Sequence, residues 1–142
     1  MDITEIPFNR LIGIRKTNGD GATLLELDDL PTYQNHLKTV HAAAQLALAE
    51  ASSAEYLLRI FKEADSDVVA VVRKVQAKFK KPVKGKVYSR AVASPEEITR
   101  FSESLDSKGK ALITVAVDIV DSEGVVAMKS LIEWFIKRQK PA

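Results

Sequence analysis

Two apolar segments near the start of the chain are separated by a run of turn-forming residues, which predicts a β-hairpin. The segments are Leu11 to Arg15 and Ala22 to Leu27. Between them, Asn18-Gly19-Asp20-Gly21 predicts a tight turn, because Gly and Asn tolerate the positive φ angles that such turns require. Residues 28–36 are polar and are expected to form a loop that leads out of the hairpin.

The pattern changes from about Thr39 to Glu63, where alanines dominate and predict one long helix. Seven alanines fall between Ala42 and Ala54 without a Gly or Pro, and alanine has the highest helix propensity. Thr39 or Asn35 is the expected cap at the start of this helix. Small side chains on most sides imply that other backbone packs closely around it.

Four more strands are predicted in the second half of the chain, with one short helix between the second and the third. Ser94-Pro95-Glu96-Glu97 opens that helix, because Pro suits the first helical position and Ser94 with Glu97 has the spacing of a capping box. Tight turns imply antiparallel pairing, and the chain lacks the strand–helix alternation of a parallel nucleotide-binding sheet. The pattern therefore indicates an α+β fold, with these strands at residues 68–80, 86–93, 110–120 and 125–137.

The composition fits a globular protein and excludes several classes of function. A chain of 142 residues is expected to form one domain with one core. Its 21 basic and 19 acidic residues give a net charge of +2, which is too balanced to indicate a nucleic-acid partner. The absence of cysteine excludes disulfides, thiolate catalysis and cysteine-ligated zinc.

Signals for export or for a membrane are also missing from the sequence. The N-terminus, Met1 to Pro7, lacks the basic start and the apolar run of a signal peptide. No window approaches the roughly 20 apolar residues that are needed to span a bilayer. We therefore expect a cytoplasmic protein without a membrane partner.

Candidate chemistry lies where the polar loop enters the alanine-rich helix. The first amides of a helix have no partner within it, so they can hold an oxygen that gains negative charge. Glu50 follows about two and a half turns after the start of the helix, and such a carboxylate can act as a base or a nucleophile. We expect Glu50 to point at the same spot as the donors that precede it.

Two sequence patterns resemble a known family. Asn35 and His41 are six residues apart, and His41 and Glu50 are nine apart; Phe79-Lys80-Lys81-Pro82-Val83-Lys84-Gly85 follows later. They resemble hotdog thioesterases of the phenylacetate-pathway type, which show the same spacing of Asn, His and acid, and a Lys-Pro-x-x-Gly hairpin. The resemblance implies a single hotdog domain over residues 1–142, in which a curved antiparallel sheet of about six strands wraps around one long helix.

The resemblance also implies roles for four residues in an acyl-CoA thioesterase. Glu50 would activate a water molecule or attack the thioester carbon, although a solvated or dimer-facing Glu is the simpler alternative. The Ala42 N–H and the Asn35 side chain would hold the thioester oxygen, whereas Asn35 could instead cap its own loop. His41 would order the loop or a dimer contact rather than transfer a proton.

The chain departs from the family at two places in this motif. A family Gly that follows the Asn is Lys38 here, and the Gly-Gly after the His is Ala42-Ala43. Glycine at these positions lets a thioester carbonyl approach the backbone closely. An Ala42 methyl group adds little bulk and leaves the amide in place, so hydrolysis remains compatible with the motif.

One basic cluster accompanies these residues, and the resemblance gives it a role. In hotdog enzymes such cations meet the phosphates of coenzyme A at the mouth of a tunnel. The alternative is a solvated hairpin and a charged edge strand, and no aromatic stacking pattern indicates nucleic acid. The cluster consists of Lys80, Lys81, Lys84, Lys86 and Arg90.

Three hypotheses follow for the function. The first is an acyl-CoA thioesterase that forms a homodimer, or a dimer of dimers, because a hotdog protomer leaves its site half built. The second is a non-catalytic acyl or acyl-CoA binding module, and the third is an interaction protein in which residue 50 lies far from any pocket. None requires a cofactor other than CoA as part of the substrate, and two histidines without an acidic partner set do not indicate a metal site.

Overall fold

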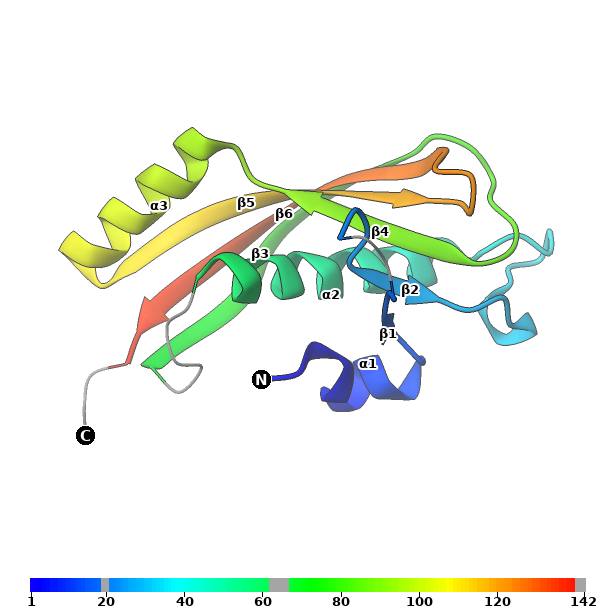
Figure 1. The fold of residues 1–142 in the computed structure, drawn as a ribbon, viewed down its shortest axis with the longest axis horizontal. Coiled ribbons are helices and arrows are strands. Elements are labelled where there is room, and N and C mark those ends of the chain that lie inside the picture. Colours follow the sequence, from blue (N-terminus) through cyan, green and yellow to red (C-terminus); the bar gives the residue numbers. More distant parts are fainter. Residues whose placement is uncertain (19–20, 62–66, 140–142) are drawn as a thin grey trace.

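A curved six-stranded sheet forms the frame of the molecule (Figure 1). The structure is a computed structural model and describes residues 1–18, 21–61 and 67–139. All paired strands are antiparallel, in the order β1-β2-β4-β5-β6-β3. Their bounds are β1 Arg15–Lys16, β2 Leu25–Leu27, β3 Val68–Phe79, β4 Val87–Val92, β5 Lys110–Val120 and β6 Val126–Arg138.

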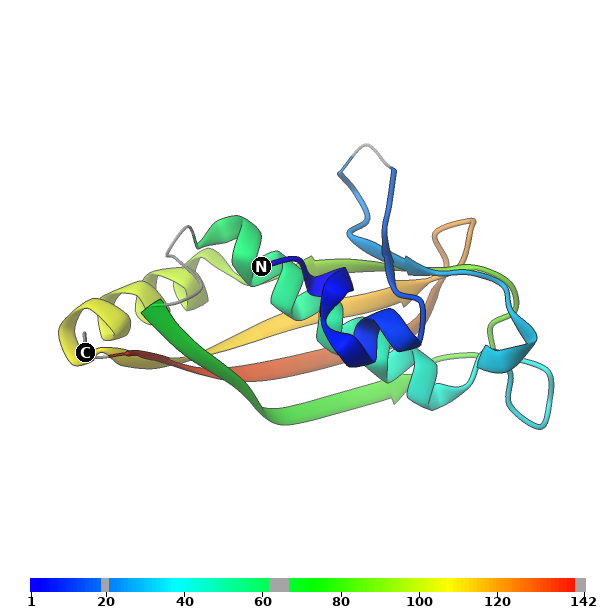
Figure 2. The same cartoon turned by 90° about the horizontal axis from the view of Figure 1, so that it is seen from below.

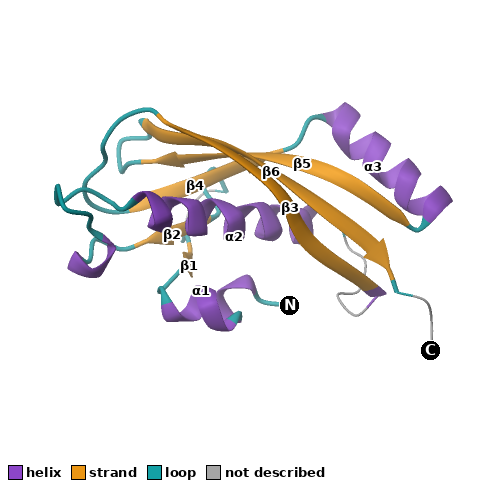
Figure 3. Ribbon diagram, turned by 180° about the vertical axis from the view of Figure 1, so that it is seen from behind, coloured by secondary structure: helices purple, strands orange, loops and turns teal. Residues whose placement is uncertain are grey.

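Helix α2 (Ala42–Ile60) runs along the concave face of this sheet (Figure 3). Its small residues allow close packing, since Ala49, Ala51 and Ser52 are almost completely buried. Ser52 also donates from its Oγ to the Leu48 carbonyl and bonds the Ser89 hydroxyl of β4. The predicted α+β fold, with a curved antiparallel sheet around one long helix, is confirmed and is the hotdog architecture.

The start of α2 differs from the prediction, because His41 is the N-cap instead of Thr39 or Asn35. The His41 Nδ1 accepts a hydrogen bond of 2.9 Å from the Ala43 amide. Asn35 is engaged within its own loop, where its Nδ2 donates to the Thr39 Oγ1 at 2.8 Å. The helix therefore begins at Ala42, later than the residue 39 that the alanine-rich pattern predicted.

The N-terminal segment corrects the predicted hairpin. Only Arg15 of the predicted strand Leu11 to Arg15 lies in a strand. Leu11 is instead the last residue of helix α1 (Pro7–Leu11), which follows a 3-10 turn (Ile3–Glu5). Pro7 suits the first position of this helix. Strand β1 is only two residues long but pairs with β2 in the predicted antiparallel sense. Residues 19 and 20 of the predicted turn lie outside the described residues.

Helix α1 lies on the side of α2 that faces away from the sheet, so the molecule has sheet, α2 and N-terminal segment in succession (Figures 1 and 2). Within this segment the buried Asn9 donates from its Nδ2 to the Ile3 carbonyl at 3.0 Å. Ile3 is also buried. The N-terminus thus covers part of α2 that the sheet does not reach.

Helix α3 (Pro95–Lys108) begins at the predicted residue but is longer than the short helix expected. The Ser94 hydroxyl accepts a hydrogen bond from the Glu97 amide at 3.1 Å, as a capping box requires. Glu97, however, accepts from the Thr114 amide of β5 at 3.0 Å, which ties the helix to the sheet. Phe101 on the buried face of α3 contacts Phe61, just beyond α2, with ring centroids 4.6 Å apart.

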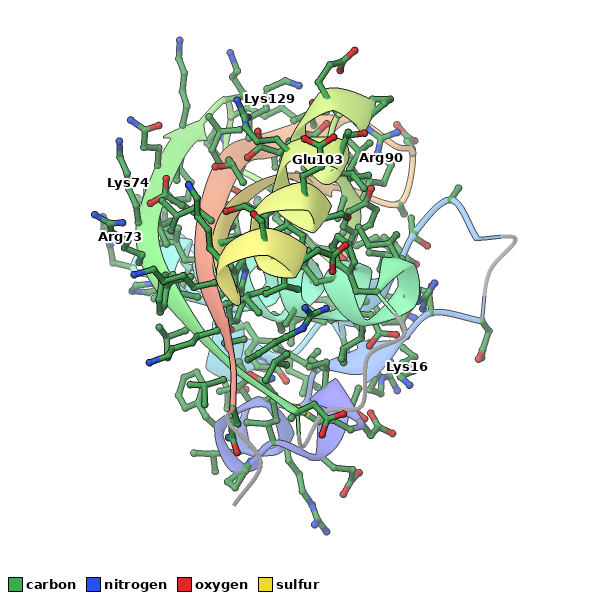
Figure 4. All side chains as sticks on the ribbon, turned by 90° about the vertical axis from the view of Figure 1, so that its left-hand side faces the viewer. Lys16, Arg73, Lys74, Arg90, Glu103 and Lys129 are labelled. Carbon is green, nitrogen blue, oxygen red and sulfur yellow. The ribbon has the colours of Figure 1, made fainter. Side chains whose placement is uncertain are left out.

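Strand β3 forms one edge of the sheet and pairs only with β6 among the described strands. The register shifts between Val72 and Lys74, so Arg73 is a bulge residue. Figure 4 shows Arg73 and Lys74 pointing away from the rest of the molecule at this edge. Apolar side chains of the same strand are 45–50% exposed, namely Val69, Val71, Val75 and Phe79.

Candidate active site

Glu50 lines a cavity of about 280 Å³ between α2, the N-terminal segment and the β3–β6 end of the sheet. The Asn9 amide, another polar group on this wall, is already bonded to Ile3. The cavity is therefore an apolar chamber with one carboxylate, and Glu50 does not lie on an open face as the third hypothesis required. Its apolar walls come from Met1, Ile3, Ile6, Ala54, Leu57, Leu58, Phe61, Val68, Ala70, Leu105, Trp134 and Ile136.

The electrostatic environment of Glu50 favours its protonated form. Burial raises the pKa of Glu50 above its ordinary value of 4.5, because the apolar walls solvate a charge poorly. Among residues 1–18, 21–61 and 67–139, none forms an ion pair or a hydrogen bond with this carboxylate. An unpaired carboxylate with a raised pKa is a stronger base than an ordinary one, as proton abstraction from water requires.

The helix start offers backbone donors without a partner. The Ala43 amide is used by His41, whereas no acceptor within the described part of the chain bonds the Ala42 or the Ala44 N–H. Ala42 and Ala43 are exposed, and Ala44 is half-buried. The Ala42 amide is therefore available to an oxygen that approaches from outside.

Asn35 has the loop role that we weighed as an alternative. Its Oδ1 accepts from the amides of Leu37 and Thr39 at 2.9 and 3.1 Å, and its Nδ2 donates to the Thr39 hydroxyl. A carboxamide carries two N–H donors, so one hydrogen of Nδ2 remains for another acceptor. Asn35 and Ala42 line one shallow depression of about 350 Å³.

A single chain does not bring Glu50 and these donors to one place. Glu50 lines the apolar cavity, while Ala42 and Asn35 line the separate depression at the start of α2. Eight residues of helix separate Ala42 from Glu50, which is about 12 Å along the axis at 1.5 Å per residue. One thioester carbon cannot contact both groups within one protomer.

Lys38 takes a conformation that explains the glycine of the resembled family. Its φ is 60°, and it is the only residue other than glycine with a positive φ in the described ranges. The turn is closed by a hydrogen bond of 3.1 Å from the Lys38 amide to the Asn35 carbonyl. The left-handed conformation costs a residue with a Cβ about 1–2 kcal/mol, which glycine would avoid.

The basic cluster is not one surface. Lys80 and Lys81 border the depression with Ala42, and Lys81 also pairs with Asp121 at 3.5 Å. Lys84 borders a neighbouring hollow that contains two aspartates. Arg90 lies on the outer face of the sheet, because the adjacent Ser89 bonds α2 and strand side chains alternate. Arg90 therefore does not join Lys80, Lys81 and Lys84, contrary to the expected cluster. Lys86 pairs with Glu26 at 3.1 Å.

The described residues include neither a candidate membrane span nor a candidate metal site. No helix among them is long and apolar enough to cross a membrane. They contain no group of three or more His, Asp or Glu side chains that could hold a metal ion. His36, which has no role in the motif, is exposed.

Sequence reasoning missed two contributors to these hollows. Gln45 is the one amide side chain in the first turns of an alanine-rich helix. A single polar residue among alanines could have indicated a role at this position. Gln45 lines the depression with Ala42. Asn9 lines the Glu50 cavity, but no signal pointed to it, because its segment was not assigned a structure and the next was predicted as a strand.

The substitution Glu50→Gln is predicted to raise the melting temperature at neutral pH. Since the folded chain holds the proton more tightly than the unfolded chain, wild-type stability falls as pH rises from the unfolded to the folded pKa of Glu50. The gain of the variant over the wild type should therefore vanish below the ordinary pKa of 4.5. Thermal unfolding between pH 4 and pH 8 measures this.

Glu55→Gln is the matched control on the same helix. Glu55 is buried and pairs with Arg59 at 3.0 Å and Lys16 at 3.9 Å, so loss of its charge should lower the melting temperature at neutral pH. Equal melting temperatures of Glu50→Gln and wild type at every pH would contradict a costly buried carboxylate at position 50.

Comparisons with known proteins agree with this architecture. The chain resembles PA5026 from Pseudomonas aeruginosa, a protein of unknown function called a probable thioesterase, at 22% identity and a TM-score of 0.79 over 96% of this chain and 91% of that one. The thioesterase HI1161 from Haemophilus influenzae is 16% identical, with a TM-score of 0.72 over 96% of this chain and 86% of that one. BH2602 from Bacillus halodurans, solved with CoA, is 18% identical, with a TM-score of 0.69 over 91% of this chain and 74% of that one. These likenesses show a shared fold.

No curated protein sequence matches the chain. A family model described as "Putative thioesterase (yiiD_Cterm)" matches residues 3–130, which is most of its length. The chain therefore belongs to this YiiD_C thioesterase family, as the resemblance to hotdog thioesterases implied.

Proposed function

We propose that the protein hydrolyses acyl-CoA thioesters with Glu50 as the general base. Glu50 takes a proton from a water molecule while the water oxygen attacks the thioester carbon. The carbonyl oxygen gains negative charge and is held by the Ala42 N–H and the remaining Asn35 N–H. The C–S bond then breaks, the CoA thiolate takes a proton, and a carboxylic acid is left. No cofactor is needed, because CoA enters as part of the substrate.

The observation that carries this proposal is the unpaired Glu50 carboxylate in an apolar cavity. An apolar chamber suits an acyl chain, since such pockets bind mainly through buried apolar surface with a few polar groups that set orientation. The presence of CoA in the structure of BH2602 supports CoA as the thiol carrier. Lys80 and Lys81, which border the depression, and the nearby Lys84 are the proposed partners of the CoA phosphates.

The proposed site is built from two chains. Because Glu50 and Ala42 are about 12 Å apart along α2, both can act on one carbonyl only if they come from different protomers. In a symmetric dimer, Glu50 of one protomer faces the Ala42 and Asn35 donors of its partner, and the reverse holds at a second site. This arrangement agrees with the expectation that one hotdog protomer leaves its site half built.

Strand β3 is the proposed contact between the two copies. It is a twelve-residue edge strand, and a long edge with exposed apolar side chains readily pairs with a second strand. Val75 and Phe79 are each 45% exposed and pair with the buried Ile132 and Met128 of β6, so they face the helix side of the sheet. Phe79 also lines the depression with Ala42. A second copy at this edge would therefore reach the donors of the first.

A larger assembly and a location are further parts of the proposal. A dimer of dimers and a cytoplasmic location, where a chain without cysteine needs no oxidising environment, stay as proposals.

A second candidate function is a binding module that holds acyl-CoA without hydrolysis. The replacement of family glycines by Lys38, Ala42 and Ala43 favours it, because bulk near the oxyanion position would hinder the approach of the thioester.

Glu50→Gln is expected to lower kcat for acyl-CoA hydrolysis by about 10²–10⁴-fold, the usual contribution of a general base. Release of free CoA thiol from a panel of acyl-CoA substrates measures this. Glu55→Gln, which alters a carboxylate outside the proposed site, should keep most of the turnover per folded molecule. Equal turnover by Glu50→Gln and wild type would remove Glu50 from the mechanism, and tight binding without any hydrolysis would favour the binding module.

Mixing two inactive variants is expected to restore activity. Ala42→Pro deletes the free N–H at the first helical position, where Pro is tolerated, and His41 already has the extended ψ of 138° that a following Pro needs. Alone it should lower kcat about 10²–10³-fold, and Ala42→Ser, which keeps the amide, should lose far less. A hybrid of Ala42→Pro and Glu50→Gln chains contains one intact composite site.

Hybrids can be isolated through two different affinity tags after co-expression, and their turnover compared with that of each parent. Activity near half that of the wild type is expected. Hybrids as inactive as their parents would show that Glu50 and the Ala42 amide act within one protomer.

Val75→Lys is expected to convert the dimer to monomers and to abolish hydrolysis, because it places a charge in the proposed apolar contact. Light scattering after size-exclusion chromatography measures the mass. Val92→Lys is the matched control, since Val92 is 59% exposed on β4, away from the β3 edge. A Val75→Lys protein with wild-type mass would contradict the proposed interface.

A further inference from the structure

Gln45 holds a buried acceptor without a partner. The side chain is only 4% exposed, and its Nε2 donates to the Val40 carbonyl at 3.2 Å. Its Oε1 is the only fully buried side-chain nitrogen or oxygen in the described ranges that lacks a hydrogen bond. The carbonyl of Val40 fixes this orientation, because the reverse placement would set two oxygens against each other.

The side chain that carries the unpartnered oxygen lines the depression at the start of α2. Gln45 lines this depression together with Ala42 and Asn35, and Lys80 and Lys81 form its rim. Ala42 and Gln45 are three residues apart on the helix, so they are neighbours on one face, with Cβ atoms about 5–6 Å apart. The depression is thus lined by a residue with a free donor, the Ala42 N–H, and by a residue whose buried acceptor, the Gln45 Oε1, lacks a partner.

A buried acceptor without a donor destabilises a protein, whereas an apolar side chain of the same shape would not. The other buried polar side chains of α2, which are Ser52, Ser53 and Glu55, all have partners within the chain. Gln45 therefore differs from them, and a buried group of this kind requires an explanation, which a ligand donor would supply.

We propose that Gln45 is a specificity-determining residue whose Oε1 accepts a hydrogen bond from the pantetheine amide N–H nearest the thioester sulfur. This inference rests on the proposed function, since it uses the acyl-CoA substrate. Two methylene groups join that amide nitrogen to the sulfur. When the thioester oxygen is bound to the Ala42 N–H, this amide therefore lies near the neighbouring residue Gln45. The rest of the pantetheine chain then leads toward Lys80 and Lys81, where the phosphates would bind.

The test compares two substrates that differ in one group. Acyl-pantetheine carries the amide N–H, and its analogue carries an ester oxygen at that position with the same acyl chain. The wild type should turn over the amide at least tenfold more efficiently in kcat/KM, because the ester cannot donate and leaves Oε1 unpaired. Gln45→Met, which has a similar shape but no acceptor, should reduce this ratio to near one.

The outcomes separate the inference from the proposed function. Equal kcat/KM values for the two substrates in the wild type would overturn the inference while leaving the thioesterase proposal in place, and this comparison does not depend on the folding of the variant. If the amide-to-ester ratio of kcat/KM is unchanged in Gln45→Met, another group or a bound water accepts the hydrogen bond from the amide, and the inference is overturned. A purely structural role of Gln45 would lower both turnovers equally. No hydrolysis of either substrate or of acyl-CoA would overturn the proposed function itself.

Discussion

The arrangement of both hollows depends on how closely the sheet approaches one face of α2. The short side chains of Ala49, Ala51 and Ser52 are almost completely buried. Successive helical residues are rotated by about 100°, so Glu50 leaves the helix on a different side from Ala49 and Ser52. It enters the space between the sheet end and the N-terminal segment. The close packing of small residues thus determines where the carboxylate points.

The sequence predicted the parts of this fold whose pattern is local and repetitive. Strand β5 coincides with its predicted range, and the long alanine-rich helix was found within a few residues. Local pattern could not predict α1, because the apolar Leu11 is exposed at the end of a short helix. The spacing of Asn35, His41 and Glu50 predicted one site, whereas the length of α2 places Glu50 and the donors in two separate hollows of one chain. The basic residues are close in the sequence, but side chains alternate between the two faces of a strand. Arg90 therefore faces away from the helix side of the sheet.

The polar groups of α2 divide into two kinds, and the division is informative. Ser52 and Ser53 are satisfied inside the chain, the latter by the indole N–H of Trp134 at 2.8 Å, so they hold the helix on the sheet. Glu50 and Gln45 have groups that nothing within the described chain satisfies. Folding alone would favour apolar side chains at both positions. The substrate and the attacking water proposed above would supply the partners that these groups lack.

This division also explains why assembly and chemistry should be coupled. The free donor and acceptor lie at the start of α2, the free base lies in its middle, and the rigid helix keeps them apart. No rearrangement of side chains can close that distance, since it is set by the backbone rise. A second, antiparallel copy of the helix can close it, because it brings the middle of one helix opposite the start of the other. Phe79 at the end of β3 is 45% exposed and lines this same depression, so the contact that would join two chains would also enclose the substrate.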